Sequence, residues 1–179
     1  MCACARTLSS VCVRTQIGSL VDVSDDRSRR AASAWAALLE AHATLVPRLD
    51  RSLQQATGLP LSWYDILLEL AAAKDKRLTM SELGERAVLS RTRVSRIVSE
   101  LETAGLVRRE GNPDDGRSAF AVMTPDGLAR YRAAAPRYLD SIEKHFAAAL
   151  TDMELDTVAT ALRKVAEQPI KLSHTRSRH

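Results

Sequence analysis

The sequence has little of several features that mark particular protein classes. Its three cysteines, Cys2, Cys4 and Cys12, all lie in the first dozen of 179 residues, so no disulfide framework holds the rest of the chain together. Aromatic residues make up only 4%, which argues against modules that stack successive bases of a single strand on Phe and Tyr. The formal net charge is only +4, so a polyanionic partner would require clustered positive residues.

Long apolar runs are also missing. No stretch reaches the roughly 18 apolar residues of a membrane-spanning helix, and Arg6 and Arg14 interrupt the N-terminal segment where a signal peptide would need an apolar run. We therefore expect a cytoplasmic protein that does not engage a membrane. The composition that is present, 45% hydrophobic and 27% charged, is typical of a globular protein with a buried core.

Motifs of catalysis and of metal binding are absent from the sequence. It contains no paired CxxC, no HExxH, no Gly-rich phosphate loop and no GxSxG. These patterns place nucleophiles, metal ligands or phosphate-binding backbone where the chemistry needs them. We therefore expect no enzyme activity, no cofactor and no metal site.

Apolar residues at helical spacing predict long amphipathic helices toward both ends of the chain. The first runs from Ala31 to just before Gly58. A second begins after Thr124, which is followed by a proline suited to the first turn. The last helix is announced by a capping box of Thr151 and Glu154. We expect the apolar stripe of that last helix to be buried.

The middle of the chain predicts a compact set of shorter elements. Ser62 is expected to cap a helix with Asp65 at its third position, and Thr79 with Glu82 is expected to cap another. A further helix follows after a three-residue break and ends at Gly105. The runs LVRRE and RSAFAVM, separated by the turn-rich GNPDDG, then predict a two-stranded hairpin. This order is helix, tight turn, helix and wing.

Together these elements predict a mainly α protein with a small antiparallel β-hairpin wing, a winged helix-turn-helix lobe flanked by long dimerisation helices from both ends of the chain. The apolar stripes of the long helices must be buried against other apolar surface. The simplest arrangement buries them against the same helices of a second copy, so we predict a two-fold homodimer. The expected divisions are a flexible N-terminal extension (1–28), the N-terminal dimerisation helix (29–58), the winged lobe (59–124), the C-terminal dimerisation helices (125–170) and a basic tail (171–179).

Positive charge gathers at the start of the second helix of the pair. Between Arg86 and Ser99 there are four arginines and no acid. A recognition helix enters the major groove by its N-terminal half, where Arg reaches guanine edges and backbone N–H groups favour phosphate. An isolated run of this kind would indicate only a solvated helix face, but its place in a helix pair before a wing favours double-stranded DNA. The predicted contact residues are Ser90, Arg91, Thr92, Arg93, Ser95 and Arg96.

The loop of the predicted wing carries Asp115 and Arg117. An arginine at the tip of a two-stranded ribbon beside a docked helix is placed to enter the adjacent minor groove, and an acid two residues earlier orients it. In the alternative interpretation, Asp115 and Gly116 only supply turn geometry and Arg117 is solvated.

Over roughly residues 31–168 the chain resembles the MarR family of winged helix-turn-helix regulators. The resemblance rests on LSWYDILLEL, LTMSELGERAVLSRTRVSRIVSELETAGLVRRE, NPDDGRS and VMTPDG, in that order and at the family's spacing. It implies a transcriptional repressor that binds a palindromic operator as a dimer and is released by a small phenolic or anionic ligand. It also implies a minor-groove role for Arg117, although Gly116 stands where a second basic residue is common.

The resemblance further implies a ligand cleft between the dimerisation helices and the DNA-binding lobe. One branch of the family, which responds to urate and related aromatic compounds, carries Trp on the first long helix, Asp on the next and Arg on the recognition helix, and Trp35, Asp65 and Arg96 are similar. In the alternative interpretation the tryptophans are core residues and Asp65 is a capping residue. The candidate ligand-binding residues are Trp35, His42, Trp63, Asp65, Arg96 and Arg108.

Two other interpretations stay open. The N-terminal cysteines allow a thiol- or metal-sensing regulator of the same fold, although they fall well before Trp35 whereas redox cysteines of the family lie at the start of the first long helix. A winged helix that serves only as a protein-interaction module would not need the arginines. Measuring affinity at rising salt concentration distinguishes this alternative from DNA binding. Affinity for DNA that depends on arginines falls steeply as salt rises, whereas affinity that depends on apolar contact does not.

Overall fold

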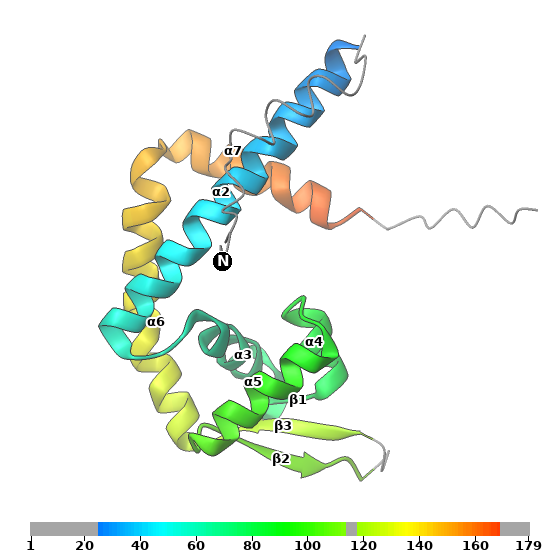
Figure 1. Cartoon of the computed structure of the whole chain (residues 1–179), viewed down its shortest axis with the longest axis vertical. Coiled ribbons are helices and arrows are strands. Elements are labelled where there is room, and N and C mark those ends of the chain that lie inside the picture. The colour runs from blue at the N-terminus through cyan, green and yellow to red at the C-terminus, as the bar shows by residue number, and fades with distance from the viewer. Residues whose placement is uncertain (1–24, 114–117, 169–179) are drawn as a thin grey trace, which may run out of the picture.

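The computed structural model describes residues 25–113 and 118–168. This part of the chain is mostly helical with one small antiparallel sheet, which confirms the predicted fold class (Figure 1). Its elements are α2 (Asp26–Thr57), α3 (Leu61–Ala72), η1 (Lys74–Lys76), β1 (Arg77–Thr79), α4 (Met80–Arg86), α5 (Arg91–Thr103), β2 (Val107–Gly111), β3 (Ala119–Met123), α6 (Pro125–His145), η2 (Ala147–Ala149) and α7 (Asp152–Ala166).

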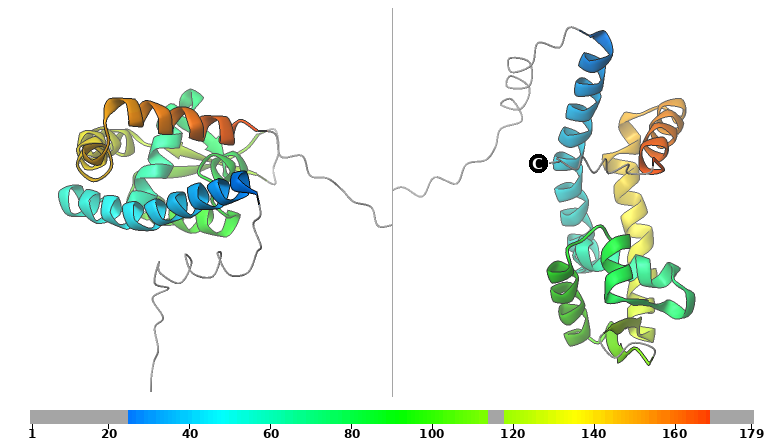
Figure 2. Two further views of the ribbon diagram at one scale, coloured as in Figure 1. Left: turned by 90° about the horizontal axis from the view of Figure 1, so that it is seen from above. Right: turned by 90° about the vertical axis from the view of Figure 1, so that its right-hand side faces the viewer.

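The long helices α2 and α6 lie side by side, although they come from opposite ends of the chain (Figures 1 and 2). Leu53 of α2 is fully buried. The side-chain oxygens of Ser52 and Ser141 are 2.8 Å apart and join the two helices through a hydrogen bond. A guanidinium N–H of Arg130 on α6 donates to the carbonyl of Thr57 at the end of α2. The N-terminal half of α2 and the whole of α7 extend beyond the lower lobe, which is formed by α3, α4, α5 and the sheet (Figures 1 and 2).

The lower lobe is built from α3, α4, α5 and the sheet around one apolar core. The inward faces of these elements meet because their apolar residues recur at helical or alternating spacing. Leu53 at the end of α2 and Ala134 on α6 join the same core, so the long helices are packed into the lobe rather than tethered to it. The fully buried large side chains are Leu53, Leu59, Ile66, Leu67, Leu70, Leu83, Val94, Ile97, Val98, Leu101 and Val107.

The sheet has three strands in the order β1-β3-β2, with both pairs antiparallel. The predicted two-stranded hairpin is present as β2 and β3, with Val107 opposite Met123 and Gly111 opposite Ala119. The strand β1 was not predicted from the sequence; it pairs with β3 and places Leu78 opposite Ala121. A three-residue strand is too short to show an alternating pattern, and its identity depends on a partner more than 40 residues later along the chain.

Most predicted helix boundaries are confirmed. Thr79 and Thr151 each form a complete capping box with the glutamate three residues later. The side chain of Thr124 accepts a hydrogen bond from the backbone N–H of Gly127, as expected of an N-cap. Gly105 follows the end of α5 in the left-handed conformation at φ +73°, the geometry that favours glycine there.

The prediction that Ser62 caps α3 is wrong. The helix begins at Leu61, Pro60 occupies the N-cap position, and no side chain of the cap makes a hydrogen bond. The N–H of Leu61 instead donates to Oδ1 of Asp50 on α2 at 2.8 Å. A capping acceptor from another helix replaces the local one, so Asp65 has no capping role and is available for another function.

The apolar stripe of α7, which the sequence predicts to be buried in a dimer, is largely exposed in a single chain. Met153 is 79% exposed and Val165 is 69% exposed. Trp35 on α2 and Leu139 on α6 are exposed to a similar degree. Separately, no helix in the described residues is both long and apolar enough to cross a membrane.

Candidate nucleic-acid interface

Helix α5 has one buried face and one exposed face. Val94, Ile97, Val98 and Leu101 recur at helical spacing and are at most 1% exposed, so they fix the rotation of the helix against the lobe. Ser90 caps its start by accepting a hydrogen bond from the backbone N–H of Arg93 at 3.4 Å. The remaining positions of the first turns must therefore face solvent.

The exposed face of α5 carries the predicted contact residues at its N-terminal end. All of them are exposed: Ser90, Arg91, Thr92, Arg93, Ser95 and Arg96. Among the described residues, Arg91 and Arg93 have no carboxylate within ion-pair distance, whereas Nε of Arg96 lies 3.7 Å from Oε1 of Glu100. We call the segment Ser90–Arg96 the arginine front. It combines exposed guanidinium groups with the N-terminus of a helix, where backbone N–H groups favour anions.

The β-ribbon is held against α5 by Arg109, which the sequence analysis did not single out. The Arg109 Nη2 donates to the carbonyl of Ser95 at 3.1 Å and to Oγ of Ser99 at 2.8 Å. Its Nη1 lies 3.3 Å from Oε2 of Glu102, and its backbone N–H donates to the same carboxylate. These contacts fix the angle of the ribbon to the arginine front. No sequence signal identifies them, because they join a strand to a helix.

Beyond the paired strands, Asn112 and Ser118 continue the ladder of hydrogen bonds. The backbone N–H of Asn112 donates to the carbonyl of Ser118 at 3.3 Å, and the two side chains are hydrogen bonded at 2.8 Å. The wing residues Asp115 and Arg117 lie outside the described residues. Their roles remain predictions.

The start of α6 is attached directly to the turn that follows α5. The hydroxyl of Thr124 donates to the carbonyl of Gly105 at 2.8 Å, and its backbone N–H donates to the carbonyl of Leu106 at 3.1 Å. Gly127 packs so closely here that a Cβ atom would lie 2.0 Å from the carbonyl oxygen of Leu106. The start of α6 is therefore packed tightly against the turn that follows α5.

The six candidate ligand-binding residues do not form one cluster within a single chain. Trp63 and Arg96 both contact Glu100, whereas Arg108 pairs with Glu110 at 2.5 Å on β2. Trp35 and His42 are exposed on α2. Trp35 precedes Asp50, the α2 residue next to α3, by about 22 Å along the helix axis at the usual rise per residue. Within a single chain it therefore lies far from Asp50 and α3.

Asp65 lies on α3 where α2 and α6 meet the lobe. Burial raises its pKa to about 6, with further increases from the negative charges of Glu69 and Asp50. Burial also raises the pKa of Tyr64 to about 12 and that of Tyr138 above its ordinary value. The ring of Tyr64 packs against those of Tyr131 and Tyr138, with centroids 5.4 and 4.7 Å away. Asp65 is thus a half-buried acid beside a cluster of tyrosines.

We expect Asp65→Asn to stabilise the protein at neutral pH. Because the folded-state pKa of Asp65 is raised, the folded state binds its proton more tightly, and the free energy of unfolding falls as pH rises from about 4 to about 6. The amide cannot ionise, so the free energy of unfolding of the variant at pH 7 should be about 1 kcal/mol higher than that of the wild type. The same substitution at a fully buried carboxyl would give a larger increase. Urea unfolding at pH 4 and pH 7 measures this difference.

The control for that substitution is Glu85→Gln on the exposed surface of α4, outside the predicted dimerisation helices. It should change the free energy of unfolding by no more than a few tenths of a kcal/mol at either pH. A loss of stability in Asp65→Asn at pH 7 would show that the ionised carboxylate makes a favourable interaction, contrary to the raised pKa.

A helix pair whose second helix presents free arginines beside a β-ribbon is the DNA-binding lobe of a winged helix-turn-helix protein. The MarR family profile matches residues 57–118. Sco3205, a MarR family transcriptional regulator from Streptomyces coelicolor solved in complex with DNA, is 36% identical with a TM-score of 0.71, and the match covers 78% of this chain and 89% of that one. AbsC, a MarR family regulator from the same organism, is 34% identical with a TM-score of 0.69, covering 80% and 94%.

The chain belongs to the MarR family. A further relative, the transcriptional repressor YetL of Bacillus subtilis, is 29% identical over 85 residues, which cover 48% of this chain and 51% of that protein. The protein is thus a DNA-binding transcriptional regulator and not an enzyme, as predicted. DNA binding by the family rules against the alternative of a module that only binds protein. The cysteines of the thiol-sensing alternative lie outside the described residues.

Proposed function

We propose that this regulator represses transcription by binding a palindromic operator as a two-fold homodimer, and that a small aromatic ligand releases it. The observation that carries the proposal is the arginine front: exposed donors at the start of a helix whose opposite face is locked into the core. Repression is supported by the name of the relative YetL.

In this proposal the arginine front enters the major groove. Arg93 and Arg96 read base edges, and Arg91 with the hydroxyl residues Ser90, Thr92 and Ser95 contacts phosphates or bases. Arg117, oriented by Asp115, enters the neighbouring minor groove from the wing. A dimer presents this surface twice, and the two recognition helices must stand about 34 Å apart to engage successive major grooves.

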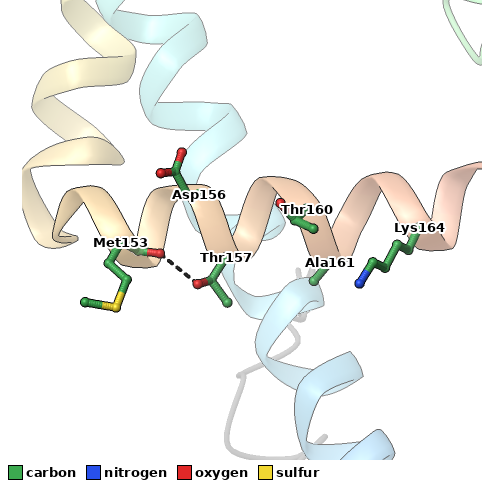
Figure 3. Close-up of a pocket in the computed structure, with 6 residues that line it drawn as sticks. All are labelled: Met153, Asp156, Thr157, Thr160, Ala161 and Lys164. Atoms are coloured by element: carbon green, nitrogen blue, oxygen red, sulfur yellow. Dashed lines mark hydrogen bonds between the residues drawn. The ribbon is translucent and has the colours of Figure 1, made fainter.

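The proposed dimer interface is formed by the exposed apolar faces of the dimerisation helices (29–58 and 125–170). An open hollow of about 750 Å³ runs along α7. Its lining residues, labelled in Figure 3, are Met153, Asp156, Thr157, Thr160, Ala161 and Lys164. The Thr157 hydroxyl donates to the carbonyl of Met153 at 2.7 Å, so its own polar group is already satisfied. Trp35, Leu139 and Val165 leave further apolar surface uncovered. A second copy that supplies the same faces would cover it.

For the effector we propose a small phenolic or anionic aromatic compound, as in the urate-responsive branch of the family. Asp65 beside the tyrosine cluster is the polar anchor, with Trp63 and Arg96 on the DNA-facing side, Arg108 on β2, and Trp35 and His42 from the partner chain. BpsR of Bordetella bronchiseptica, which shares the fold at 18% identity and a TM-score of 0.67, has its DNA binding regulated by 6-hydroxynicotinic acid. A ligand that prefers a non-binding dimer about 100-fold shifts the equilibrium by at most about 2.7 kcal/mol per site.

The experiment is to select an operator from random duplexes with the wild-type protein and then measure its affinity at rising salt. Several arginine–phosphate contacts predict a steep, log-linear loss of affinity with salt concentration. The selected sequence should be palindromic, and small aromatic acids, urate included, should then be screened for release of the complex. A non-palindromic consensus would contradict the dimeric arrangement, and affinity indifferent to salt would contradict the arginine front.

A further inference from the structure

Glu100 lies where α3 meets α5, one helical turn behind Arg96. Its Oε2 accepts a hydrogen bond from the indole Nε1 of Trp63 on α3 at 3.0 Å. Its Oε1 lies 3.7 Å from Nε of Arg96. Trp63 is itself partly buried against the core of the lobe. Its packed indole therefore fixes the position of the Glu100 carboxylate through this hydrogen bond.

The atom of Arg96 that faces Glu100 matters for what Arg96 can do. A guanidinium that meets a carboxylate through Nε keeps both terminal Nη groups for another partner, and these two groups form the fork that matches O6 and N7 of guanine. Arg91 and Arg93, the other arginines of the front, have no such support among the described residues. Glu100 therefore faces one arginine in particular, across an exposed ion pair, without occupying its terminal donors.

The charge of Glu100 has a second consequence. Binding to non-specific DNA depends almost entirely on attraction to phosphates, and a carboxylate on the same helix face opposes that attraction on every sequence. At the operator, the same carboxylate orients Arg96 toward a base edge. The base contact that results compensates for the repulsion between the carboxylate and the phosphates. A group that weakens wrong complexes while supporting the right one increases discrimination.

We propose that Glu100, held by Trp63, is a positioning residue that makes Arg96 a base-reading rather than a phosphate-binding arginine, and so determines DNA specificity. This inference rests on the proposed docking of the arginine front. It assigns Glu100 no contact with DNA. Trp63 acts one step further away, by fixing the carboxylate from α3.

The test uses the full-length dimer and two duplexes: the operator selected by the wild-type protein, and a scrambled duplex of equal length and composition. In Glu100→Gln the amide oxygen can still accept from Trp63, while the charge that faces Arg96 is lost. We expect about threefold weaker binding to the operator and about threefold tighter binding to the scrambled duplex, so that discrimination falls about tenfold. Glu143→Gln removes the same charge from the exposed surface of α6 and should leave discrimination unchanged.

Double variants show whether the effect passes through Arg96. In the Arg96→Ala background, Glu100→Gln should no longer weaken operator binding, whereas in the Arg93→Ala background it should act as in the wild type. Trp63→Phe keeps a packed ring without the N–H donor and should lower discrimination by about two- to threefold. Melting temperatures check that each variant is folded.

Three results would overturn the inference: equal changes on both duplexes in Glu100→Gln, the same loss of discrimination without Arg96, or unchanged discrimination in Trp63→Phe. Failure of the proposed function is a different result. In that case Arg93→Ala and Arg96→Ala would themselves bind the operator as tightly as the wild type does.

Discussion

Alanine at position 127 is expected to lower the free energy of unfolding by about 3 kcal/mol or more, the range of severe packing defects. The new Cβ would lie 2.0 Å from the carbonyl oxygen of Leu106 and 3.3 Å from the side chain of Met123. The oxygen belongs to backbone and accepts the hydrogen bond from the Thr124 N–H, so it cannot move away alone. Relief of the clash requires α6 to separate from the turn after α5. Urea unfolding followed by circular dichroism measures the loss.

Two other glycines provide matched controls for that substitution. A Cβ at Gly111 would meet no atom within 4 Å, so Gly111→Ala should be nearly neutral. Gly105 also has open space but sits at φ +73°, so Gly105→Ala should cost only the strain of the left-handed conformation, about 1 kcal/mol. A Gly127→Ala variant as stable as Gly111→Ala would contradict the close attachment of α6 to the recognition helix.

Loss of Arg93 or Arg96 from the arginine front should produce the largest change in DNA binding. We expect Arg93→Ala and Arg96→Ala each to weaken operator binding by about 1 to 3 kcal/mol, roughly tenfold to a hundredfold, because each loses contacts in the major groove. Both side chains are exposed on α5, so folding and dimerisation should be unaffected. Titration of labelled operator, with size-exclusion chromatography in parallel, separates these effects.

The control is Arg29→Ala, which removes the same charge from the exposed N-terminal part of α2, far from α5 (Figure 1). Its operator affinity should stay close to that of the wild type. If both α5 variants bound like Arg29→Ala, the assignment of the arginine front to the major groove would be wrong.

Local signals in the sequence predicted most of the helices, because their determinants lie within a few residues. The capping boxes at Thr79 and Thr151 each place acceptor and donor three residues apart, and both form as expected. The inward stripe of α5 follows from its own periodicity, and the outward position of the arginines follows from that stripe. The position of the arginine front was therefore accessible from the sequence.

The features that were missed depend on partners distant in the chain. The cap of α3 comes from Asp50 on another helix, not from Ser62. The strand β1 depends on its antiparallel pairing with β3. The hydrogen bonds of Arg109 and the contact between Trp63 and Glu100 each join two elements that no local pattern brings together. Burial of Asp65, which raises its pKa, likewise depends on packing of α2 and α6 that periodicity alone does not specify.

Those distant contacts also describe how the two ends of the molecule are coupled. The hydroxyl and N–H of Thr124 attach the start of α6 to the turn after α5, and Arg130 attaches α6 to the end of α2. A change in the angle between the long helices therefore has a continuous route to the recognition helix. This is the physical basis on which a ligand near Asp65 would alter the spacing of the two arginine fronts in the proposed dimer.

The most direct measurement maps where the start of α5 lies on the operator. All three cysteines, Cys2, Cys4 and Cys12, lie in the first dozen residues, so a variant with serine at each of them and Val88→Cys carries a single thiol. Val88 is 88% exposed in the turn just before the arginine front and is not one of the proposed DNA contacts. An iron chelate attached there cleaves the nearest DNA. We predict two clusters of cuts, related by the two-fold axis of the operator and centred about one helical turn apart. Cuts spread evenly along the duplex, or confined to one half-site, would contradict the paired major-groove docking of α5.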